Sequence, residues 1–334
     1  MEKRKLKKGE IVLSIIAIFI LFLFAFSYIV YHRSVMATLC EYTLRIYIDD
    51  VSEEEVIKKL DERVALGDVK YVLEYKNFDF VVEEKEESGM QVFYINEQEK
   101  PENVIIYLHG GTYVDQPINF HWRFLNKLAK NTKAEIVVPL YPLAPNHTYL
   151  EAYDCLTEFY ENYTNNHPES NVILMGDSAG GGLALGLAIH FGEIGISQPD
   201  RLILISPWVD MSMTNERIND FLHTDPMLKM PKINVCAKSW ANGKDLKYWK
   251  LSPLYGDLTK LKNVTIFVGT RELLYPDCKL LSEKLENANI EYSFNTGVGC
   301  NHDYLLYPIS EANKGMTIIK KTINSIQNEK NNEE

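Results

Sequence analysis

The longest apolar run of the chain lies near its N-terminus. Residues 11–31 include no charged side chain, whereas residues 1–10 carry five basic and two acidic ones. An α-helix rises about 1.5 Å per residue, so a run of this length can cross a hydrocarbon layer of about 30 Å. A cleaved signal peptide is the alternative, but its apolar core is usually about 7–15 residues long and precedes a small-residue cleavage site. The pattern therefore predicts a single uncleaved transmembrane anchor.

The basic residues before this run predict its orientation in the membrane. Positively charged flanks stay on the cytoplasmic side. Residues 1–10 are therefore predicted to be cytoplasmic, and residues 32–334 are predicted to form a domain on the extracytoplasmic side of the cell membrane.

From residue 69 onwards, short apolar runs follow one another along the chain. The first of them alternate between apolar and polar positions, which predicts strands at an antiparallel edge of a sheet, over residues 69–75, 78–82 and 91–95. After them, continuous apolar runs alternate with helical patterns, which is typical of a mostly parallel sheet with helices on both faces. The predicted strands are 104–108, 135–139, 172–175, 201–205, 264–268 and 291–295, and the predicted helices are 119–130, 148–163, 180–190, 277–287 and 310–326.

Two stretches do not follow this alternation. Residues 32–66 show helical periodicity, with Ser52 followed by three glutamates at a typical helix start. Residues 208–260 are rich in Met, Trp and Pro, and we expect them to form an insertion above the sheet. No repeat or low-complexity linker divides the chain, so the anchor is predicted to precede one α/β domain.

Composition narrows the classes of function. The 334 residues are 46% apolar and 24% charged, which is ordinary for a chain that buries a core. The net charge is −11, and because residues 1–10 carry +3, the remainder carries −14. An acidic body argues against a nucleic-acid partner. Five cysteines without a C-x-x-C spacing predict neither a zinc site nor a disulfide framework, so we expect free, mostly buried thiols.

The strand predicted for residues 172–175 leads into Gly-Asp-Ser-Ala-Gly at residues 176–180. In a G-x-S-x-G turn between a strand and a helix, the serine is exposed on a strained turn, and a Cβ at either glycine would collide with a neighbouring element. A plain Gly-rich turn or a phosphate loop shares part of this pattern. The helix predicted to follow places Ser178 at a helix N-terminus, which favours developing negative charge. Ser178 is therefore the predicted nucleophile.

A serine hydroxyl is a weak nucleophile, so it needs a base and an acid that orients the base. In this type of fold the chain order is Ser, acid, His. His302 is the one histidine beyond the last predicted strand, which makes it the candidate base. Glu272 follows strand 264–268 and is the candidate acid. Asp277 is its rival, but it lies after Pro276 at a helix start, where capping free N–H groups would explain it.

The donors for the oxyanion are expected in the loop after the strand at residues 104–108. Gly110, Gly111 and Thr112 follow that strand directly. Glycines let backbone N–H groups reach a site without obstruction by a side chain. Together with the N–H of Ala179, these three residues form the predicted oxyanion hole.

These motifs together resemble the hormone-sensitive-lipase-like branch of the α/β-hydrolase fold. The resemblance covers about two-thirds of the chain, in the family's order. The residues that carry it are His-Gly-Gly-Thr-Tyr at 109–113, Tyr-Pro-Leu-Ala-Pro at 141–145, Gly-Asp-Ser-Ala-Gly-Gly at 176–181, Ser-Pro-Trp at 206–208, Gly-Thr-Arg-Glu-Leu-Leu at 269–274, and His302. It implies esterase activity on short- to medium-chain acyl esters, no cofactor, and a cap over the site built from residues near 32–66 and 208–260.

The chain departs from the family's pattern at two positions. Thr112 stands where the third glycine is usual, which crowds the outer edge of the oxyanion hole. Glu272 stands where an aspartate is usual, and its longer side chain requires a slightly retracted backbone. The interval of 30 residues between Glu272 and His302 supports this alignment over Asp277. Neither departure removes a chemical role.

The leading hypothesis is therefore a membrane-anchored serine carboxylesterase acting on a small-molecule ester. An amidase, or a deacetylase of acetylated sugars or aryl amides, would use the same triad. A non-catalytic ligand receptor on the same fold is a third hypothesis, although such proteins usually lose the base, and His302 is present. A lipase would need an apolar rim, which residues 221–230 could supply. The sequence does not predict the oligomeric state.

Overall fold

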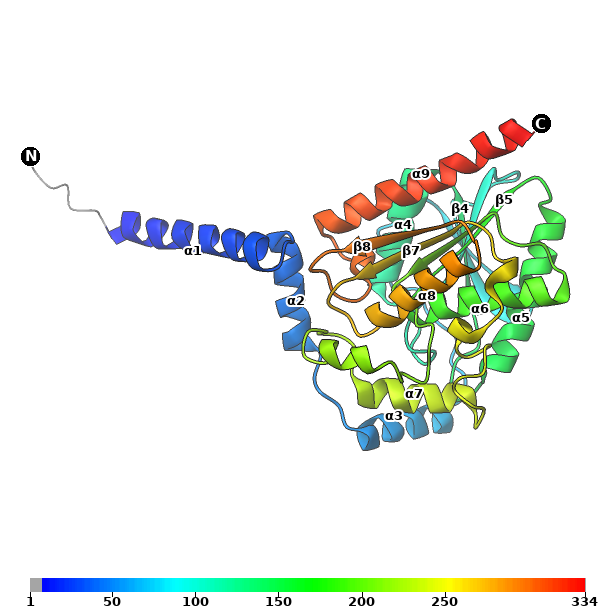
Figure 1. The fold of residues 1–334 in the computed structure, drawn as a ribbon, viewed down its shortest axis with the longest axis horizontal. Helices are drawn as coiled ribbons and strands as arrows, with labels where there is room; N and C mark the ends of the chain where they lie inside the picture. Colours follow the sequence, from blue (N-terminus) through cyan, green and yellow to red (C-terminus); the bar gives the residue numbers. More distant parts are fainter. Residues whose placement is uncertain (1–7, 334) are drawn as a thin grey trace, which may run out of the picture.

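An eight-stranded sheet runs through the body of the protein, with helices on both faces (Figure 1). The computed structural model describes residues 8–333. The strand order is β1-β2-β4-β3-β5-β6-β7-β8, and β1–β2 and β2–β4 are the antiparallel pairs. The strands are β1 Val82–Glu87, β2 Met90–Ile95, β3 Asn103–Leu108, β4 Glu135–Leu140, β5 Asn171–Asp177, β6 Arg201–Ile205, β7 Val264–Gly269 and β8 Tyr292–Gly297.

Two hydrophobic cores flank this sheet, because successive side chains of a strand point to opposite faces. In β3, Val104 and Ile106 enter the core shared with α5, α6 and α8, whereas Ile105 and Tyr107 enter the core shared with α4 and α9. The helices in these layers are α4 Asn119–Thr132, α5 Tyr149–Asn166, α6 Ser178–Ile194, α8 Tyr275–Asn287 and α9 Ser310–Glu333. The predicted α/β order from residue 104 onwards is thus confirmed.

The strands predicted at 69–75 and 78–82 are wrong. The sheet begins only at Val82, and the preceding segment forms no ladder. Its alternate side chains, including Tyr71 and Phe78, pack against Trp122 in the core shared with α4 and α9. The side chain of Gln91 bonds the backbone of Tyr71 on both sides, with its amide donating to the carbonyl (2.9 Å) and its oxygen accepting the N–H (3.1 Å). The alternation therefore reflects burial on one side of an extended segment without strand pairing.

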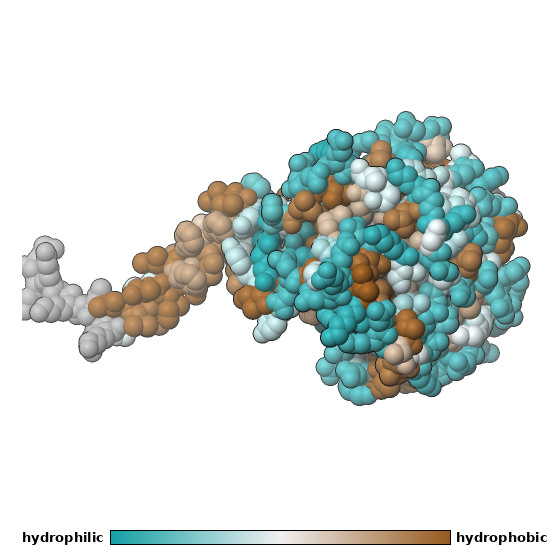
Figure 2. Space-filling view, turned by 90° about the horizontal axis from the view of Figure 1, so that it is seen from below, coloured by the Kyte–Doolittle hydropathy of each residue, from teal (hydrophilic) through white to brown (hydrophobic). Residues whose placement is uncertain are grey.

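Three helices precede the sheet: α1 Lys8–Val30, α2 Val35–Tyr47 and α3 Glu53–Leu66. Within α1, Ile11–Val30 has a mean hydropathy of 2.8 and only 6% of its hydrophobic window is buried. It projects from a mostly hydrophilic body as an apolar rod (Figure 2). Length and composition of this kind fit a membrane span or a signal sequence. Residues 1–7, which hold most of the predicted cytoplasmic flank, lie outside the described residues.

The two stretches predicted to depart from the alternation come together in space. α3 lies beside α7 (Met230–Ala241) at one end of the body (Figure 1). α3 begins as predicted, with Ser52 and Glu55 forming a capping box. The stretch around α7 also contains short 3₁₀ helices, η1 Glu216–Phe221, η2 Pro253–Tyr255 and η3 Leu258–Lys260; a further one, η4 Tyr304–Leu306, follows β8.

Candidate active site

Ser178 lies on the sharp turn between β5 and α6. Its φ of 50° falls in the left-handed region, which few non-glycine residues adopt. A Cβ at Gly176 would stand 2.4 Å from the carbonyl oxygen of Gly180, and one at Gly180 would stand 2.0 Å from that of Leu108. Both glycines are therefore required for steric reasons, as the sequence predicted, and they let β3 and α6 approach the turn closely.

His302 lies in the loop that follows β8, and its imidazole reaches the serine. The distance from Nε2 of His302 to Oγ of Ser178 is 2.9 Å, although the residues are 124 positions apart. Both residues are buried, at 1% and 4% exposure. This distance is within the range for a hydrogen bond between a nucleophile and its base.

Glu272 reaches the other nitrogen of the same ring. Its Oε1 lies 3.5 Å from Nδ1 of His302, in a fully buried position. Its Oε2 accepts hydrogen bonds from the hydroxyl of Ser206 (2.9 Å) and the N–H of Gly269 (3.2 Å). Burial disfavours the charged carboxylate and raises the pKa of Glu272, although His302 opposes the shift. The carboxylate is thus held on the far side of the imidazole from Ser178.

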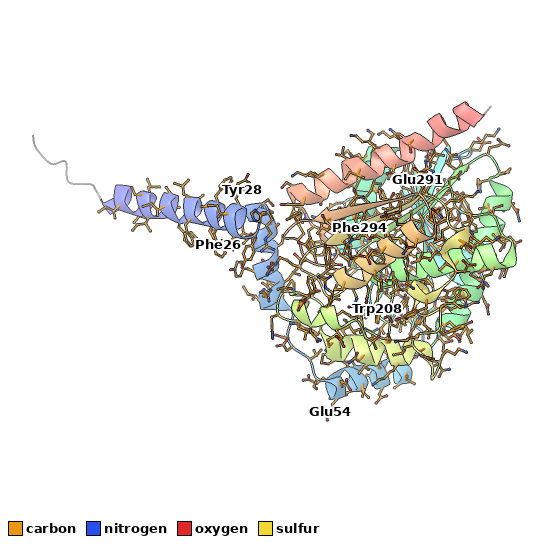
Figure 3. All side chains as sticks on the ribbon, viewed as in Figure 1. Phe26, Tyr28, Glu54, Trp208, Glu291 and Phe294 are labelled. Atoms are coloured by element: carbon orange, nitrogen blue, oxygen red, sulfur yellow. The ribbon has the colours of Figure 1, made fainter. Side chains whose placement is uncertain are left out.

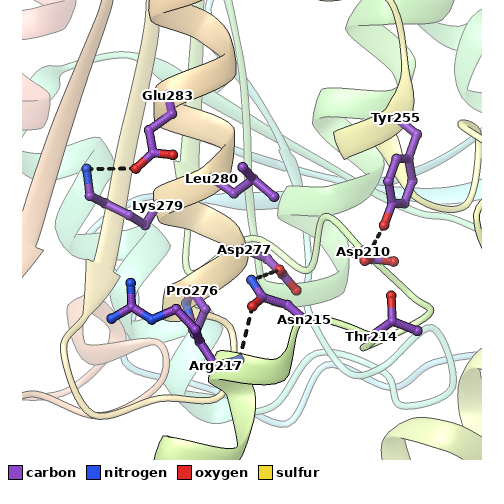
Figure 4. A pocket seen from close by; sticks show the side chains of 10 residues that line it. All are labelled: Asp210, Thr214, Asn215, Arg217, Tyr255, Pro276, Asp277, Lys279, Leu280 and Glu283. Carbon is purple, nitrogen blue, oxygen red and sulfur yellow. Dashed lines mark hydrogen bonds and ion pairs between the residues drawn. The ribbon is translucent and has the colours of Figure 1, made fainter.

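The rival acid, Asp277, lies elsewhere. Its Oδ1 accepts a hydrogen bond from the side-chain amide of Asn215 (2.8 Å), and it lines a hollow of about 330 Å³ between α8 and residues 210–217 (Figure 4). Burial raises its pKa to about 6. The helix cap expected for Asp277 is wrong, because α8 begins after Leu274 with no side-chain cap. Asp277 belongs to the first turn of α8, which follows the loop that carries Glu272, so the two acidic residues are close in sequence but have different partners.

The loop after β3 approaches Ser178 as the sequence predicted, but one of its N–H groups is already engaged. Gly110 donates its N–H to Oδ1 of Asp177 (2.9 Å), which leaves Gly111, Thr112 and Ala179 as the predicted donors. Gly111 has a φ of 128°, and a Cβ there would stand 2.4 Å from the carbonyl oxygen of Asp115. Ala179 is in the first turn of α6, where N–H groups have no partner within the helix.

Asp177 fixes this loop, a role that sequence reasoning missed. Its Oδ1 also accepts the hydroxyl of Tyr107 (2.5 Å), and its Oδ2 lies 3.2 Å from Nε2 of His121. The N–H of Ile118 donates to Nδ1 of His121, so Nε2 of His121 carries the proton that faces Asp177. The available signal was its position immediately before the serine in the G-x-S-x-G pattern.

A second acidic residue missed from the sequence is Asp303. Its Oδ2 lies 3.2 Å from Nε2 of His302, the nitrogen that also contacts Ser178. Burial disfavours the charged imidazolium, but Asp303 and Glu272 outweigh it and raise the pKa of His302 to about 10. Burial also acts to raise the pKa of Asp303, and the charge of His302 opposes that shift. The site therefore holds two carboxyl groups around one imidazole.

The helices α3 and α7 are tied to the loop after β3 through Asp115. Arg63 of α3 lies 2.5 Å from Oδ1 of Asp115, and Lys232 of α7 lies 2.7 Å from its Oδ2. Tyr113 of the same loop stacks on Trp240 of α7 at 4.6 Å between ring centroids. The structure thus connects the predicted oxyanion loop directly to the two helices above it.

Comparisons with known proteins assign the chain to a family. A family model of the α/β-hydrolase fold matches residues 105–306, more than half of the chain, and the chain belongs to this family. An esterase from Acinetobacter venetianus is 28% identical over 223 residues, which cover 66% of this chain and 73% of that protein. Esterase LipU from Mycobacterium tuberculosis is 29% identical over 210 residues, covering 60% and 69%.

Solved structures extend the similarity to most of the chain. The crystal structure of a provisionally assigned esterase from Staphylococcus aureus has a TM-score of 0.77 and 29% identity, and covers 84% of this chain and 95% of that one. The structure of EstE5 soaked with ethyl alcohol has a TM-score of 0.73 and 25% identity, and covers 88% and 98%. The protein is a serine hydrolase of the carboxylesterase type within the α/β-hydrolase family.

Proposed function

We propose that Ser178, His302 and Glu272 form the catalytic triad of an esterase that hydrolyses short- to medium-chain acyl esters. The observation that carries this proposal is the 2.9 Å contact between Nε2 of His302 and Oγ of Ser178, with Glu272 on the opposite nitrogen. No other carboxyl group contacts Nδ1 of His302 among the ion pairs of residues 8–333. The order of the three residues in the chain is the order expected for this fold.

Acylation begins when Oγ of Ser178 attacks the ester carbonyl carbon and its proton passes to Nε2 of His302. Glu272 stabilises the imidazolium that forms and keeps the Nδ1 proton on its own side. The carbonyl oxygen becomes an oxyanion, to which the N–H groups of Gly111, Thr112 and Ala179 donate. Each such donor contributes about 3–4 kcal/mol to lowering the barrier.

The tetrahedral intermediate then breaks down. The C–O bond to the alcohol cleaves, and the imidazolium of His302 donates its proton to the departing oxygen, leaving the acyl group on Ser178. A water molecule attacks this acyl ester next, with His302 again accepting the proton. Return of that proton to Oγ releases the carboxylic acid and regenerates the hydroxyl of Ser178.

The surroundings of Ser178 support small acyl groups. The N–H of Trp208 donates to the carbonyl oxygen of Ser178 (2.9 Å), and Tyr113 lies between Trp208 and Trp240, with ring centroids 5.8 Å and 4.6 Å away. We expect these bulky buried rings to restrict the length of acyl chain that the site accepts. We assign α3 and α7, with the remainder of residues 32–66 and 208–260, as the cap over this site.

A membrane anchor is part of the same proposal. α1 packs little against the body, so its apolar surface has no role in a core, and a bilayer would cover it. The anchor places residues 1–10 in the cytoplasm and the catalytic domain outside it. Carbonate extraction of membranes tests this: we expect the chain to stay in the pellet with α1 attached. A soluble chain that begins after residue 30 would identify α1 as a cleaved signal sequence.

Turnover by the full-length chain in detergent tests the catalytic proposal. We expect hydrolysis of p-nitrophenyl acetate and butyrate to exceed that of the decanoate, and the Ser178→Ala variant to lose it. The matched acetyl p-nitroanilide reports amide cleavage, which we expect to be slower than ester cleavage. Equal activity of the Ser178→Ala variant would contradict the proposal.

A further inference from the structure

The helix α2 runs across the end of α1 instead of continuing it (Figure 1). Four residues, 31–34, separate the two helices, and His32 has a φ of 53°, which ends the first helix. Four residues span at most about 14 Å even when fully extended. The start of α2 therefore lies close to the end of α1, and a bilayer that holds α1 must pass near α2.

One side of α2 is fixed to the body. Arg33, just before the helix, donates to Glu41 and to the carbonyl oxygen of Gly299 (2.6 Å) in the loop that carries the base. Ser34 donates its N–H to Glu311 of α9 (2.6 Å). Ala37 and Glu41 are buried on this side. The orientation of α2 about its own axis is thus set by contacts with the catalytic domain.

The opposite side of α2 is mostly apolar and has no partner in the described body; its polar member, Thr43, donates its hydroxyl to the carbonyl oxygen of Leu39 (2.9 Å) within the helix. Its exposed apolar side chains recur at helical spacing, so they share one face. They are Met36 (50% exposed), Leu39 (43%), Tyr42 (48%), Ile46 (73%) and Tyr47 (80%). The charged residues within Val35–Tyr47 are Glu41 and Arg45, and they pair with each other at 2.7 Å away from this face. The exposed face therefore carries no charge.

We propose that this face of α2 docks in the surface of the bilayer, so that the rim of the active site is presented to esters dissolved in the lipid. A helix with one apolar face lies in the plane of the interface, with that face about 5–10 Å deep among the headgroups and acyl chains. Tyrosines are typical of this zone, and Tyr42 and Tyr47 occupy it here. The inference deepens the proposed membrane attachment and rests on α1 being an anchor.

The second half of the proposal follows from what α2 contacts. Arg45 donates to the carbonyl oxygens of His223 (3.3 Å) and Thr224 (2.8 Å). The next residue, Asp225, accepts the N–H of Leu273 (2.9 Å), which directly follows the acid Glu272. α2, residues 223–225 and the loop that carries Glu272 are thus joined by hydrogen bonds into one connected unit, and a docked α2 holds this unit beside the lipid.

Spin labels on the full-length chain in phosphatidylcholine nanodiscs measure the depth of this face. The labelled variants are Leu39→Cys and Ile46→Cys on α2, Phe19→Cys within α1, and Glu54→Cys as an aqueous control, because Glu54 is exposed on α3 far from α1 (Figure 3). Burial raises the pKa of Cys40, Cys155, Cys236, Cys278 and Cys300, so these native thiols react slowly at neutral pH.

We expect the two α2 labels to be relaxed by oxygen more than by a water-soluble nickel chelate, at a depth of about 5–10 Å. The Glu54→Cys label should show the opposite preference. If the α2 labels are in water while the Phe19→Cys label is deep in the bilayer, this inference is overturned and the proposed anchor remains. A Phe19→Cys label in water would overturn both. Dipolar broadening of the α2 labels with protection from both reagents would mean that a second copy covers the face, which also overturns the inference.

An activity measurement tests the consequence for substrate access. The double variant Leu39→Glu, Ile46→Glu should hydrolyse soluble p-nitrophenyl butyrate as the unaltered chain does. Its turnover of a butyrate ester of a long-chain alcohol, dissolved in the nanodisc, should fall about tenfold, the effect of a loss of about 1.4 kcal/mol in docking. Val72→Glu, at an exposed position outside the face, is the matched control and should change neither rate. Equal lipid-phase rates for all three chains would overturn the proposal.

Discussion

Oδ2 of Asp303 and Nε2 of His302 are 3.2 Å apart, on the side of the imidazole that contacts the nucleophile. Nε2 has either one proton or one lone pair, so it cannot donate a hydrogen bond to Asp303 and accept one from Ser178 at the same time. When His302 is charged, its Nε2–H can donate to the carboxylate of Asp303. When it is neutral, it can accept the hydroxyl proton of Ser178. Asp303 therefore favours the charged, non-basic state of His302.

Replacing Asp303 by asparagine should make His302 a base at lower pH. The two carboxylates raise the pKa of His302 to about 10, and a raised pKa keeps the imidazole charged until the pH exceeds it. Loss of one carboxylate lowers that pKa, and we expect the acidic limb of kcat/KM to move down by about one pH unit or more. The measurement is the pH profile of butyrate ester hydrolysis, corrected for the spontaneous reaction. An unmoved limb would show that Asp303 does not control the base.

The assignment of the acid makes a second prediction. Glu272→Gln keeps the shape of the side chain but removes the charge that stabilises the imidazolium, and kcat should fall by about 10³–10⁴-fold. Asp277→Asn is the control, because Asp277 bonds Asn215 and lines a separate hollow. We expect its kcat to stay within about twofold, as for a change that leaves the transition state untouched. Comparable losses in both variants would contradict the choice of Glu272.

The contacts of Asp115 predict a coupling between the cap and substrate binding. Asp115→Ala removes the ion pairs to Arg63 and Lys232, which hold α3 and α7 to the oxyanion loop. These side chains are partly exposed, so we expect a loss of about 1 kcal/mol or less in the free energy of unfolding. KM should rise several-fold because the cap is less well held. Steady-state kinetics and thermal unfolding measure the two effects, and a variant with unchanged KM would contradict the coupling.

The turn around Ser178 predicts a steric effect of a single methyl group. In Gly180→Ala the new Cβ would lie 2.0 Å from the carbonyl oxygen of Leu108, so β3 and α6 must separate. Overpacking of this kind costs about 1–3 kcal/mol or more. Gly195→Ala is the matched control, because its Cβ meets open space and only its φ of 79° is unfavourable, at about 1–2 kcal/mol. Denaturant unfolding compares them, and a Gly180→Ala variant as stable as the control would contradict this account.

The sequence was most informative where one local pattern has one structural solution. The continuous apolar strands and the G-x-S-x-G turn predicted the parallel part of the sheet and the place of Ser178. The interval to His302 and the position of Glu272 after β7 predicted two further residues, and the structure brings His302 to that serine and Glu272 to the other side of the imidazole. These inferences hold because the carboxyl ends of parallel strands meet at one edge of the sheet.

The remaining features depend on tertiary contacts that a local pattern does not encode. The alternation before Val82 predicted strands, but those side chains pack on Trp122 without backbone pairing. The sequence pattern did not predict β1 at Val82–Glu87, because this edge strand consists almost entirely of charged residues and has no apolar alternation. Charged side chains on an edge strand prevent its pairing with other chains. The sequence pattern does not distinguish Gly110 from the other predicted oxyanion donors, because its N–H is occupied by a tertiary hydrogen bond to Asp177. Asp303 adjoins the base in sequence, yet only the loop's left-handed turn at φ 54° brings it to Nε2.

The central claim is that Ser178 is the nucleophile activated by His302. Mass spectrometry after treatment with diethyl p-nitrophenyl phosphate tests it most directly, because this reagent transfers its phosphoryl group to an activated serine and the adduct persists. We predict one diethylphosphoryl group per chain, on the peptide that contains Ser178, formed in step with the loss of esterase activity and absent from the Ser178→Ala variant. An active chain that carries the group on another residue, or a Ser178→Ala variant that is still labelled and still hydrolyses esters, would contradict the account.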